Sequence, residues 1–184
     1  MRKITLSLLA GSVALAFAGS AMAENPMVGG AAMYADKNIV ENAVNSKDHT
    51  TLVAAVKAAG LVETLSGEGP FTVFAPTNAA FEKLPAGTVD TLLKPENKDQ
   101  LTKVLTCHVV AVDAMSDAIG KMIADDGGDH PVKTVGGCML SAKMDGDNIT
   151  LTDENGNVAT VTIADVDQSN GVIHVIDTVL LPKA

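Results

Sequence analysis

The spacing of apolar residues changes at Gly127-Gly128, and this change limits the folds that the chain can adopt. Before these glycines, apolar residues recur with the helical period, as on the buried face of an amphipathic helix. After them, apolar and polar residues alternate, as in β-strands with one buried face. Helices that come first and antiparallel hairpins that come later predict an α+β fold. No internal repeat is visible in the sequence, so one copy of the domain is expected.

Cap and stop residues divide the first part of the chain into four predicted helices. Gly60 and Pro85 are stop signals, and Thr77 can cap the helix that follows it. Asn97, with Gln100 three residues later, resembles a capping box. The predicted helices cover residues 49–59, 78–84, 97–105 and 115–123.

Strand signals are strongest in the second part of the chain. Asn155-Gly156 is a pair typical of tight hairpin turns. The run from Val172 to Leu181 is almost wholly apolar, as expected for a strand buried on both faces. Phe74 and Ile176 are predicted core residues, since each lies within an apolar strand-like run. The predicted strands cover residues 71–75, 138–144, 149–152, 159–163 and 172–181.

The first residues have the order of a secretory signal peptide. Arg2 and Lys3 precede an apolar stretch, and Ala21-Met22-Ala23 is a cleavage signal of small residues. We therefore expect residues 1–23 to be removed, residues 24–36 to form a flexible leader, and residues 37–184 to form the domain. The predicted location is the periplasm or the external medium.

Composition restricts the partners of such a domain. The chain has a net charge of −9, no Trp and one Tyr, and Arg2 is its single arginine. Nucleic-acid binding requires basic side chains and stacking aromatics, so nucleic acid is excluded as a partner. No second apolar stretch has the length of a membrane span, so membrane insertion is not expected either. The protein is expected to be a monomer.

Three segments carry a resemblance to a known family. Residues 71–81 (FTVFAPTNAAF) and residues 170–177 (NGVIHVID), with VLLP at 179–182, resemble the paired signature segments of fasciclin (FAS1) domains. Residues 107–110 (CHVV) resemble the Tyr-His segment of the same family, with Cys107 in place of the tyrosine. The resemblance covers residues 37–184.

The resemblance implies a wedge of antiparallel and mixed β-strands with a layer of α-helices. It also implies a role in adhesion, with a protein or a component of a cell surface or matrix as the partner, and without enzymatic activity. No cofactor is expected. His108, Val109 and Val110 become the candidate interaction segment, although the Cys107 substitution weakens that transfer. The short export signal and the small size suggest a bacterial, exported, single-domain member.

Catalytic and metal-binding alternatives have weaker sequence support. His174 and Asp177 are three residues apart in a predicted strand and therefore point to opposite faces, so they cannot act as a catalytic pair. His174 is expected to be a core histidine with satisfied ring nitrogens. The acidic turns at residues 125–130 and 145–154 leave calcium binding open, although no EF-hand loop is present. A small-ligand binding protein and, less favoured, a hydrolase stay as alternative functions.

Cys107 and Cys138 are predicted to form a disulfide. They are the two cysteines of a chain with an export signal, and an even count in an oxidising compartment usually indicates a bridge. Both also adjoin apolar positions, so both should face inward. The alternative is a pair of buried free thiols, which would behave as small hydrophobic residues.

Overall fold

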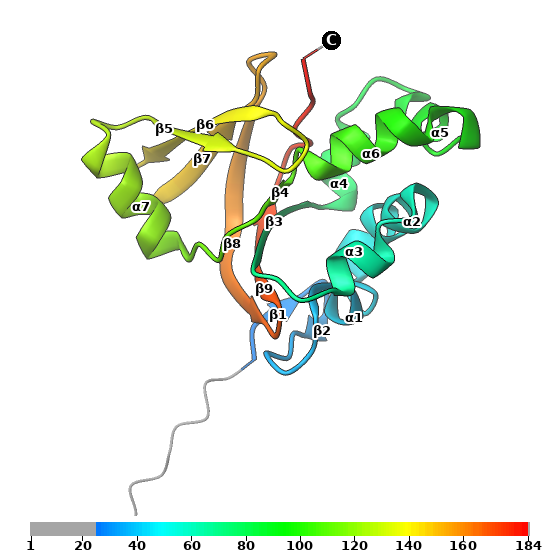
Figure 1. Ribbon diagram of the computed structural model, residues 1–184, viewed down its shortest axis with the longest axis horizontal. Coiled ribbons are helices and arrows are strands. Elements are labelled where there is room, and N and C mark those ends of the chain that lie inside the picture. The colour runs from blue at the N-terminus through cyan, green and yellow to red at the C-terminus, as the bar shows by residue number, and fades with distance from the viewer. Residues whose placement is uncertain (1–24, 184) are drawn as a thin grey trace, which may run out of the picture.

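The computed structural model describes residues 25–183 and shows a curved β-sheet with helices on both sides (Figure 1). The predicted signal peptide lies outside these residues. The helices are α1 (Ile39–Ala43), α2 (Thr50–Ala59), α3 (Val62–Ser66), α4 (Asn78–Glu82), α5 (Thr88–Leu92), α6 (Lys98–Thr106) and α7 (Ser116–Asp125). The strands are β1 (Met27–Val28), β2 (Ala31–Ala32), β3 (Phe71–Pro76), β4 (Val109–Val110), β5 (His130–Lys133), β6 (Met139–Asp145), β7 (Asn148–Thr152), β8 (Val158–Gln168) and β9 (Gly171–Ile176). The α+β prediction is confirmed.

Seven strands form one mixed sheet in the order β4-β3-β9-β8-β7-β6-β5. Strands β3 and β9 are parallel, and the other neighbours are antiparallel. The sheet curls until it is nearly a barrel. Its two ends meet where the Val135 N–H donates to the Val109 carbonyl (2.8 Å) and the Gly136 N–H to the Thr106 carbonyl (2.9 Å).

Strands β3 and β9 separate two hydrophobic cores. Val73 and Ala75 of β3 pack into the core under the layer formed by α1 to α6. Phe74 and Ile176 point to the opposite side, into the core that the curled strands share with α7. They are 2% and 0% exposed, so the prediction that both are core residues is confirmed.

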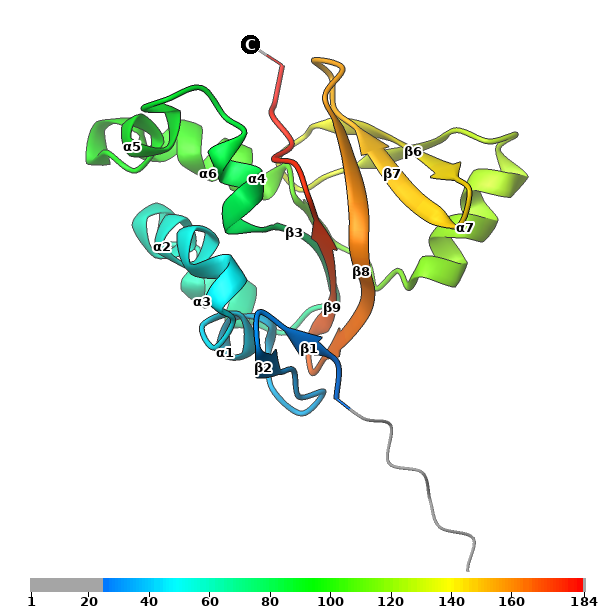
Figure 2. The ribbon, with the colours of Figure 1, turned by 180° about the vertical axis from the view of Figure 1, so that it is seen from behind.

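Strand β8 contributes to both cores, and its side chains change face where its pairing with β9 is irregular. Val161 packs in the core beside α7, whereas Ile163, two residues further on, packs against the core under the helix layer. One register shift lies between these two residues and a second between Ile163 and Val166, where Asp165 has a positive φ of 57°. Each extra residue in a bulge turns the following side chains to the other face of the sheet. This long strand follows the curve of the sheet (Figure 2).

Local signals set several helix ends. Gly60 ends α2 in the left-handed conformation (φ 74°), and the Thr77 hydroxyl caps α4 by accepting the Ala80 N–H at 3.2 Å, both as predicted. The predicted capping box at Asn97 is wrong. Its side chain makes no cap hydrogen bond and instead donates to the Thr91 carbonyl at 2.8 Å. A reciprocal capping box lies instead at the start of α1, between Asn38 and Glu41.

The expected flexible leader is corrected by the structure. Strands β1 and β2 form a small hairpin beside α1 (Figure 2), and Val28 and Met33 are 3% and 2% exposed within the core under the helix layer. Gly29 and Gly30 adopt positive φ values of 59° and 77° in the turn. Burial of two apolar side chains therefore orders a segment whose composition suggested flexibility.

Candidate functional site

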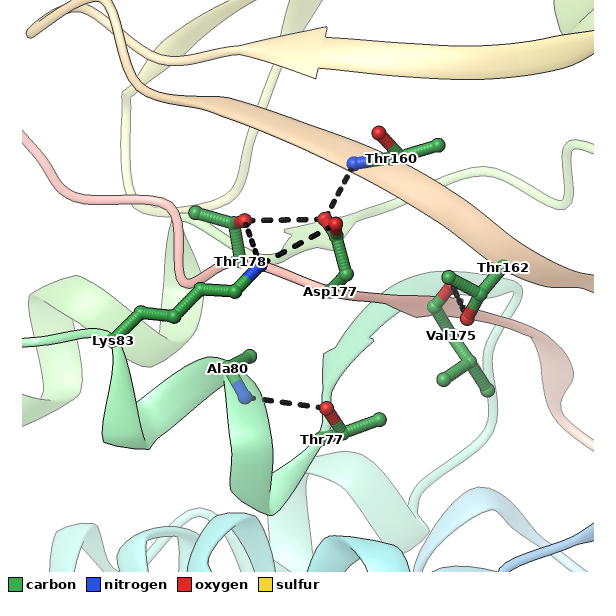
Figure 3. Close-up of polar contacts among 8 residues, drawn as sticks. All are labelled: Thr77, Ala80, Lys83, Thr160, Thr162, Val175, Asp177 and Thr178. Carbon is green, nitrogen blue, oxygen red and sulfur yellow. Dashed lines mark hydrogen bonds and ion pairs between the residues drawn. The ribbon is translucent and has the colours of Figure 1, made fainter.

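The two signature segments lie side by side in the middle of the sheet. Strand β3 pairs with β9 in parallel, from Phe71 opposite Gly171 to Pro76 opposite Ile176. Residues that follow two parallel strands emerge at the same edge of a sheet. Thr77 and Asp177 therefore both lie at the edge where these strands end, next to α4 (Figure 3).

Polar groups of four residues meet at this edge, and we call these residues the polar cluster: Lys83, Thr160, Asp177 and Thr178. One Asp177 carboxylate oxygen accepts the Thr160 N–H at 2.8 Å and the Thr178 hydroxyl at 3.1 Å. The other accepts a hydrogen bond from the Lys83 ammonium at 3.4 Å, which also contacts the Thr178 hydroxyl at 3.3 Å (Figure 3). The Lys83 and Asp177 side chains are 53% and 40% exposed, so a partner can reach both charges.

The polar cluster keeps Asp177 charged. Partial burial alone would raise its pKa, but the hydrogen bonds from Thr160 and Thr178 and the positive charge of Lys83 outweigh that effect. The pKa of Asp177 is therefore below its ordinary value. The cluster presents a carboxylate, an ammonium group and hydroxyls to the solvent, which suits recognition by complementary charge and hydrogen bonding.

The predicted interaction segment lies elsewhere and is largely inaccessible. His108 and Val109 are 2% and 5% exposed, and Val110 is half-buried beside the core that contains α7. The segment forms the turn after α6 and the short edge strand β4, which pairs with β3. We therefore correct the prediction that residues 108–110 form a contact surface, because His108 and Val109 are buried and Val110 packs beside the core.

His108 is held in one neutral form by its two neighbours. Its Nδ1 lies 2.8 Å from the Val104 carbonyl, which can only accept, so Nδ1 carries the proton. Its Nε2 accepts the Leu180 N–H at 2.9 Å and is therefore unprotonated. Burial lowers the pKa of His108 to about 4, although the hydrogen bond to Val104 and the charge of Asp153 act in the opposite direction.

His174 has the same arrangement, as predicted for a core histidine. Its Nε2–H donates to the Ala114 carbonyl at 2.8 Å, and its Nδ1 accepts the Asp165 N–H at 3.2 Å. Its ring stacks on Phe74 with centroids 5.7 Å apart, and burial lowers its pKa. Asp177 makes its hydrogen bonds to other residues, so the structure does not bring His174 and Asp177 together as a catalytic pair.

The folded protein should lose stability in mild acid because His108 resists protonation. The unfolded chain takes up a proton near the ordinary pKa of 6.5, whereas folded His108 does so near pH 4. The contribution of neutral His108 to the free energy of unfolding is fully present above pH 6.5. It is lost as the pH falls, and the loss is about 2 kcal/mol at pH 5. Urea unfolding of wild type and His108→Gln between neutral pH and pH 5 measures this loss.

The free energy of unfolding of His108→Gln should change less with pH than that of wild type, whatever the stability of the variant at neutral pH. Ala58→Gln is the control, because Ala58 is an exposed residue of α2 and the change introduces a glutamine without removing a titratable group. This control should keep the wild-type dependence. An equal pH dependence in wild type and His108→Gln would contradict the assignment of the proton linkage to His108.

The structure joins Cys107 and Cys138 in a disulfide, the pairing that the sequence predicted. Their Cα atoms are 5.4 Å apart, and the residues are 0% and 2% exposed. The bond links the end of α6 to the residue before β6. It therefore reinforces the closure of the sheet beside the hydrogen bonds of Val135 and Gly136.

Several carboxylates of the acidic turns make internal contacts. Asp126 pairs with His130, and Asp129 lies 3.2 Å from the Lys143 ammonium. Hydrogen bonding from Ser141 and the contact with Lys143 lower the pKa of Asp129. Within residues 25–183, no three His, Cys, Asp or Glu side chains are grouped as metal ligands.

Two hollows in the structure test whether the protein could bind a small ligand. An apolar cavity of about 50 Å³ lies between the helix layer and the sheet, whereas sites for drug-sized ligands occupy roughly 300–1,000 Å³. A second, polar hollow of about 440 Å³ lies beside residues 66–70 and 168–171. In its wall, the Asn170 amide already donates to the Leu65 and Gly67 carbonyls at 2.8 and 2.9 Å. Neither hollow has the volume of a ligand site together with an apolar lining and convergent polar groups.

The curled mixed sheet, its central parallel pair and its helix layer define the class of fold to which the chain belongs. A family model described as fasciclin domain matches residues 47–182. The chain therefore belongs to the fasciclin domain family, as the signature segments indicated. None of the helices formed by residues 25–183 has both the length and the apolar character of a membrane span.

Curated relatives come from bacteria and animals. The chain is 51% identical over 159 residues to Protein sll1483 of Synechocystis sp., covering 86% of this chain and 81% of that protein. It is 36% identical over 168 residues to the cell surface glycolipoprotein MPB83 of Mycobacterium bovis, covering 88% and 69%. It is 39% identical over 133 residues to transforming growth factor-beta-induced protein ig-h3 of Sus scrofa, covering 72% of this chain but 17% of that protein.

Among solved structures, the chain resembles the FAS1 domain pair of the insect cell adhesion molecule fasciclin I. The TM-score is 0.68 with 17% sequence identity, over 79% of this chain and 51% of that chain. At this identity the similarity establishes the fold.

Proposed function

We propose that this chain is an exported surface-interaction module that acts without catalysis. The observation that carries the proposal is the exposed polar cluster at the edge where both signature strands end. Its charges are accessible, whereas the imidazoles of His108 and His174 are buried and use both ring nitrogens in internal hydrogen bonds. A buried, neutral imidazole in such a setting supports the fold and is not positioned to act on a substrate.

Export and the class of partner extend this proposal. The N-terminal sequence has the order of a signal peptide, and one relative is named a cell surface glycolipoprotein. The solved neighbour is described as a cell adhesion molecule. We infer that the partner is a protein or another component of a cell surface or matrix. The polar cluster requires a partner that offers groups complementary to Lys83 and Asp177.

Binding to cell envelopes tests the proposal. Labelled mature protein should bind envelopes of the source cells saturably, and unlabelled protein should compete. Lys83→Ala should weaken this binding several-fold with little effect on folding, because an exposed ion pair contributes only about 0–1 kcal/mol to stability. Lys94→Ala is the matched control, since Lys94 is an exposed lysine in the α5–α6 connection.

Two outcomes would contradict the proposal. Non-saturable binding would remove the case for a specific partner. Equal binding by Lys83→Ala, Lys94→Ala and wild type would remove the polar cluster as the contact surface.

A further inference from the structure

The turn between β7 and β8 presents an asparagine followed by a glycine to the solvent. Asn155 and Gly156 are both exposed. Gly156 has φ 86°, and a Cβ atom placed on it would meet open space. A glycine in this position leaves its backbone nitrogen unobstructed for approach to the preceding side-chain amide.

Asn155 also fastens residues 179–183, which we call the C-terminal segment. Its Nδ2 donates to the Leu181 and Pro182 carbonyls, both at 3.1 Å. Carboxylates of the same turn hold the neighbouring amides, with Asp153 accepting the Leu181 N–H at 2.9 Å and Glu154 the Lys183 N–H at 3.1 Å. In this turn the Asn155 amide donates hydrogen bonds to the C-terminal segment, whereas the Asp153 and Glu154 carboxylates accept hydrogen bonds from it.

We propose that Asn155 is a site of spontaneous deamidation and that this modification loosens the C-terminal segment. The Gly156 backbone nitrogen loses its proton and attacks Cγ of Asn155, forming a C–N bond and closing a five-membered succinimide ring. The Cγ–Nδ2 bond breaks, and Nδ2 leaves as ammonia after taking up a proton. Water then opens the ring at either carbonyl, leaving aspartate or isoaspartate. The net reaction consumes one water and releases one ammonia, with no oxidant or reductant.

The product cannot make the contacts of the amide. A carboxylate has no donor for the Leu181 and Pro182 carbonyls, and its negative charge faces two carbonyl oxygens. It also lies in a turn that already contains Asp153 and Glu154. Repulsion among these groups disfavours the attached position of the C-terminal segment.

The chain contains a second Asn-Gly pair that is protected by its surroundings. The Asn170 side chain accepts the Ile39 N–H at 3.0 Å and donates to the Leu65 and Gly67 carbonyls. Gly171 is buried at the start of β9 and packs against the Phe71 backbone. To turn toward the next backbone nitrogen, the half-buried Asn170 side chain must break three hydrogen bonds that hold both its oxygen and its nitrogen, whereas the exposed Asn155 side chain must break two that hold its nitrogen alone. The Gly156 N–H, by comparison, is held by one turn hydrogen bond to the Asp153 carbonyl at 3.1 Å.

Peptide mass mapping tests the chemical step. Folded protein is incubated in mildly alkaline buffer, and the peptide with Asn155 should gain about one dalton and contain isoaspartate, while the Asn170 peptide stays unchanged. In denaturant the two peptides should react at similar rates, because their sequences share the Asn-Gly pair. Equal rates for Asn155 and Asn170 in the folded protein would overturn the proposal.

The structural consequence has its own test. Asn155→Asp, which places the reaction product in the turn, should speed hydrogen exchange at the Leu181 amide by about tenfold or more. Asn148→Asp is the matched control, because it makes the same change of charge in the neighbouring β6–β7 turn and should leave that exchange rate at the wild-type value. Unchanged exchange in Asn155→Asp would show that deamidation does not release the C-terminal segment.

Discussion

Replacing Phe74 by alanine should lower the free energy of unfolding by about 3–5 kcal/mol. The side chain is 2% exposed in the core beside α7, and its ring stacks on His174. Truncation removes buried apolar surface and leaves a cavity that paired strands on both sides prevent from collapsing. Ile176→Ala, in the same core on the neighbouring strand β9, should cost about 2–5 kcal/mol.

Chemical denaturation of the purified variants measures both effects. Val158→Ala is the control, because Val158 is 52% exposed on β8 and its truncation should change stability by no more than about 0.5 kcal/mol. Midpoints near the wild-type value for Phe74→Ala and Ile176→Ala would mean that this core contributes little to stability.

Removing the disulfide should cost about 3–4 kcal/mol in a Cys107→Ala/Cys138→Ala double variant. The bond closes a loop between residues separated by 31 positions, and the expected loss follows from the chain entropy that such a loop removes from the unfolded state. Alanine is preferred to serine because both positions are buried, where a hydroxyl would need a hydrogen-bond partner.

Accessibility to reductant gives a second measurement on the wild-type protein. Because both cysteines are buried, reduction should be slow in native buffer and fast in denaturant. Denatured, unreduced protein should show no titratable thiol. Two titratable thiols in protein isolated from its natural compartment would contradict the bridge and leave the fasciclin assignment intact.

Sequence patterns predicted those parts of the fold that depend on neighbouring residues. Gly60 and Thr77 set helix ends through their own backbone conformation or hydroxyl group, so both positions were predictable. Strand β5 was missed, since its four residues include Pro131 and it is a strand because β6 lies beside it. The hairpin of β1 and β2 was missed for a similar reason, although Gly29-Gly30 was an available turn signal.

The candidate site was less predictable than the fold. The sequence indicated the pairing of Cys107 with Cys138 because the chain offers one combination of two cysteines. It gave no signal for the contact of Lys83 with Asp177, which are 94 positions apart and meet through the parallel register of β3 and β9. The family resemblance directed attention to His108, but its side chain is buried and therefore belongs to the interior of the protein.

The position of β9 has a consequence for the order of folding. This strand is the last in the sequence, yet it lies between β3 and β8 and bridges the two halves of the sheet. While residues 171–176 are absent from a growing chain, β3 lacks its parallel partner and neither core is complete. Pairing of β3 with β9 also closes a loop of about one hundred residues, which slows folding by its entropic cost. We therefore expect a growing chain to complete its fold only after β9 has been synthesised.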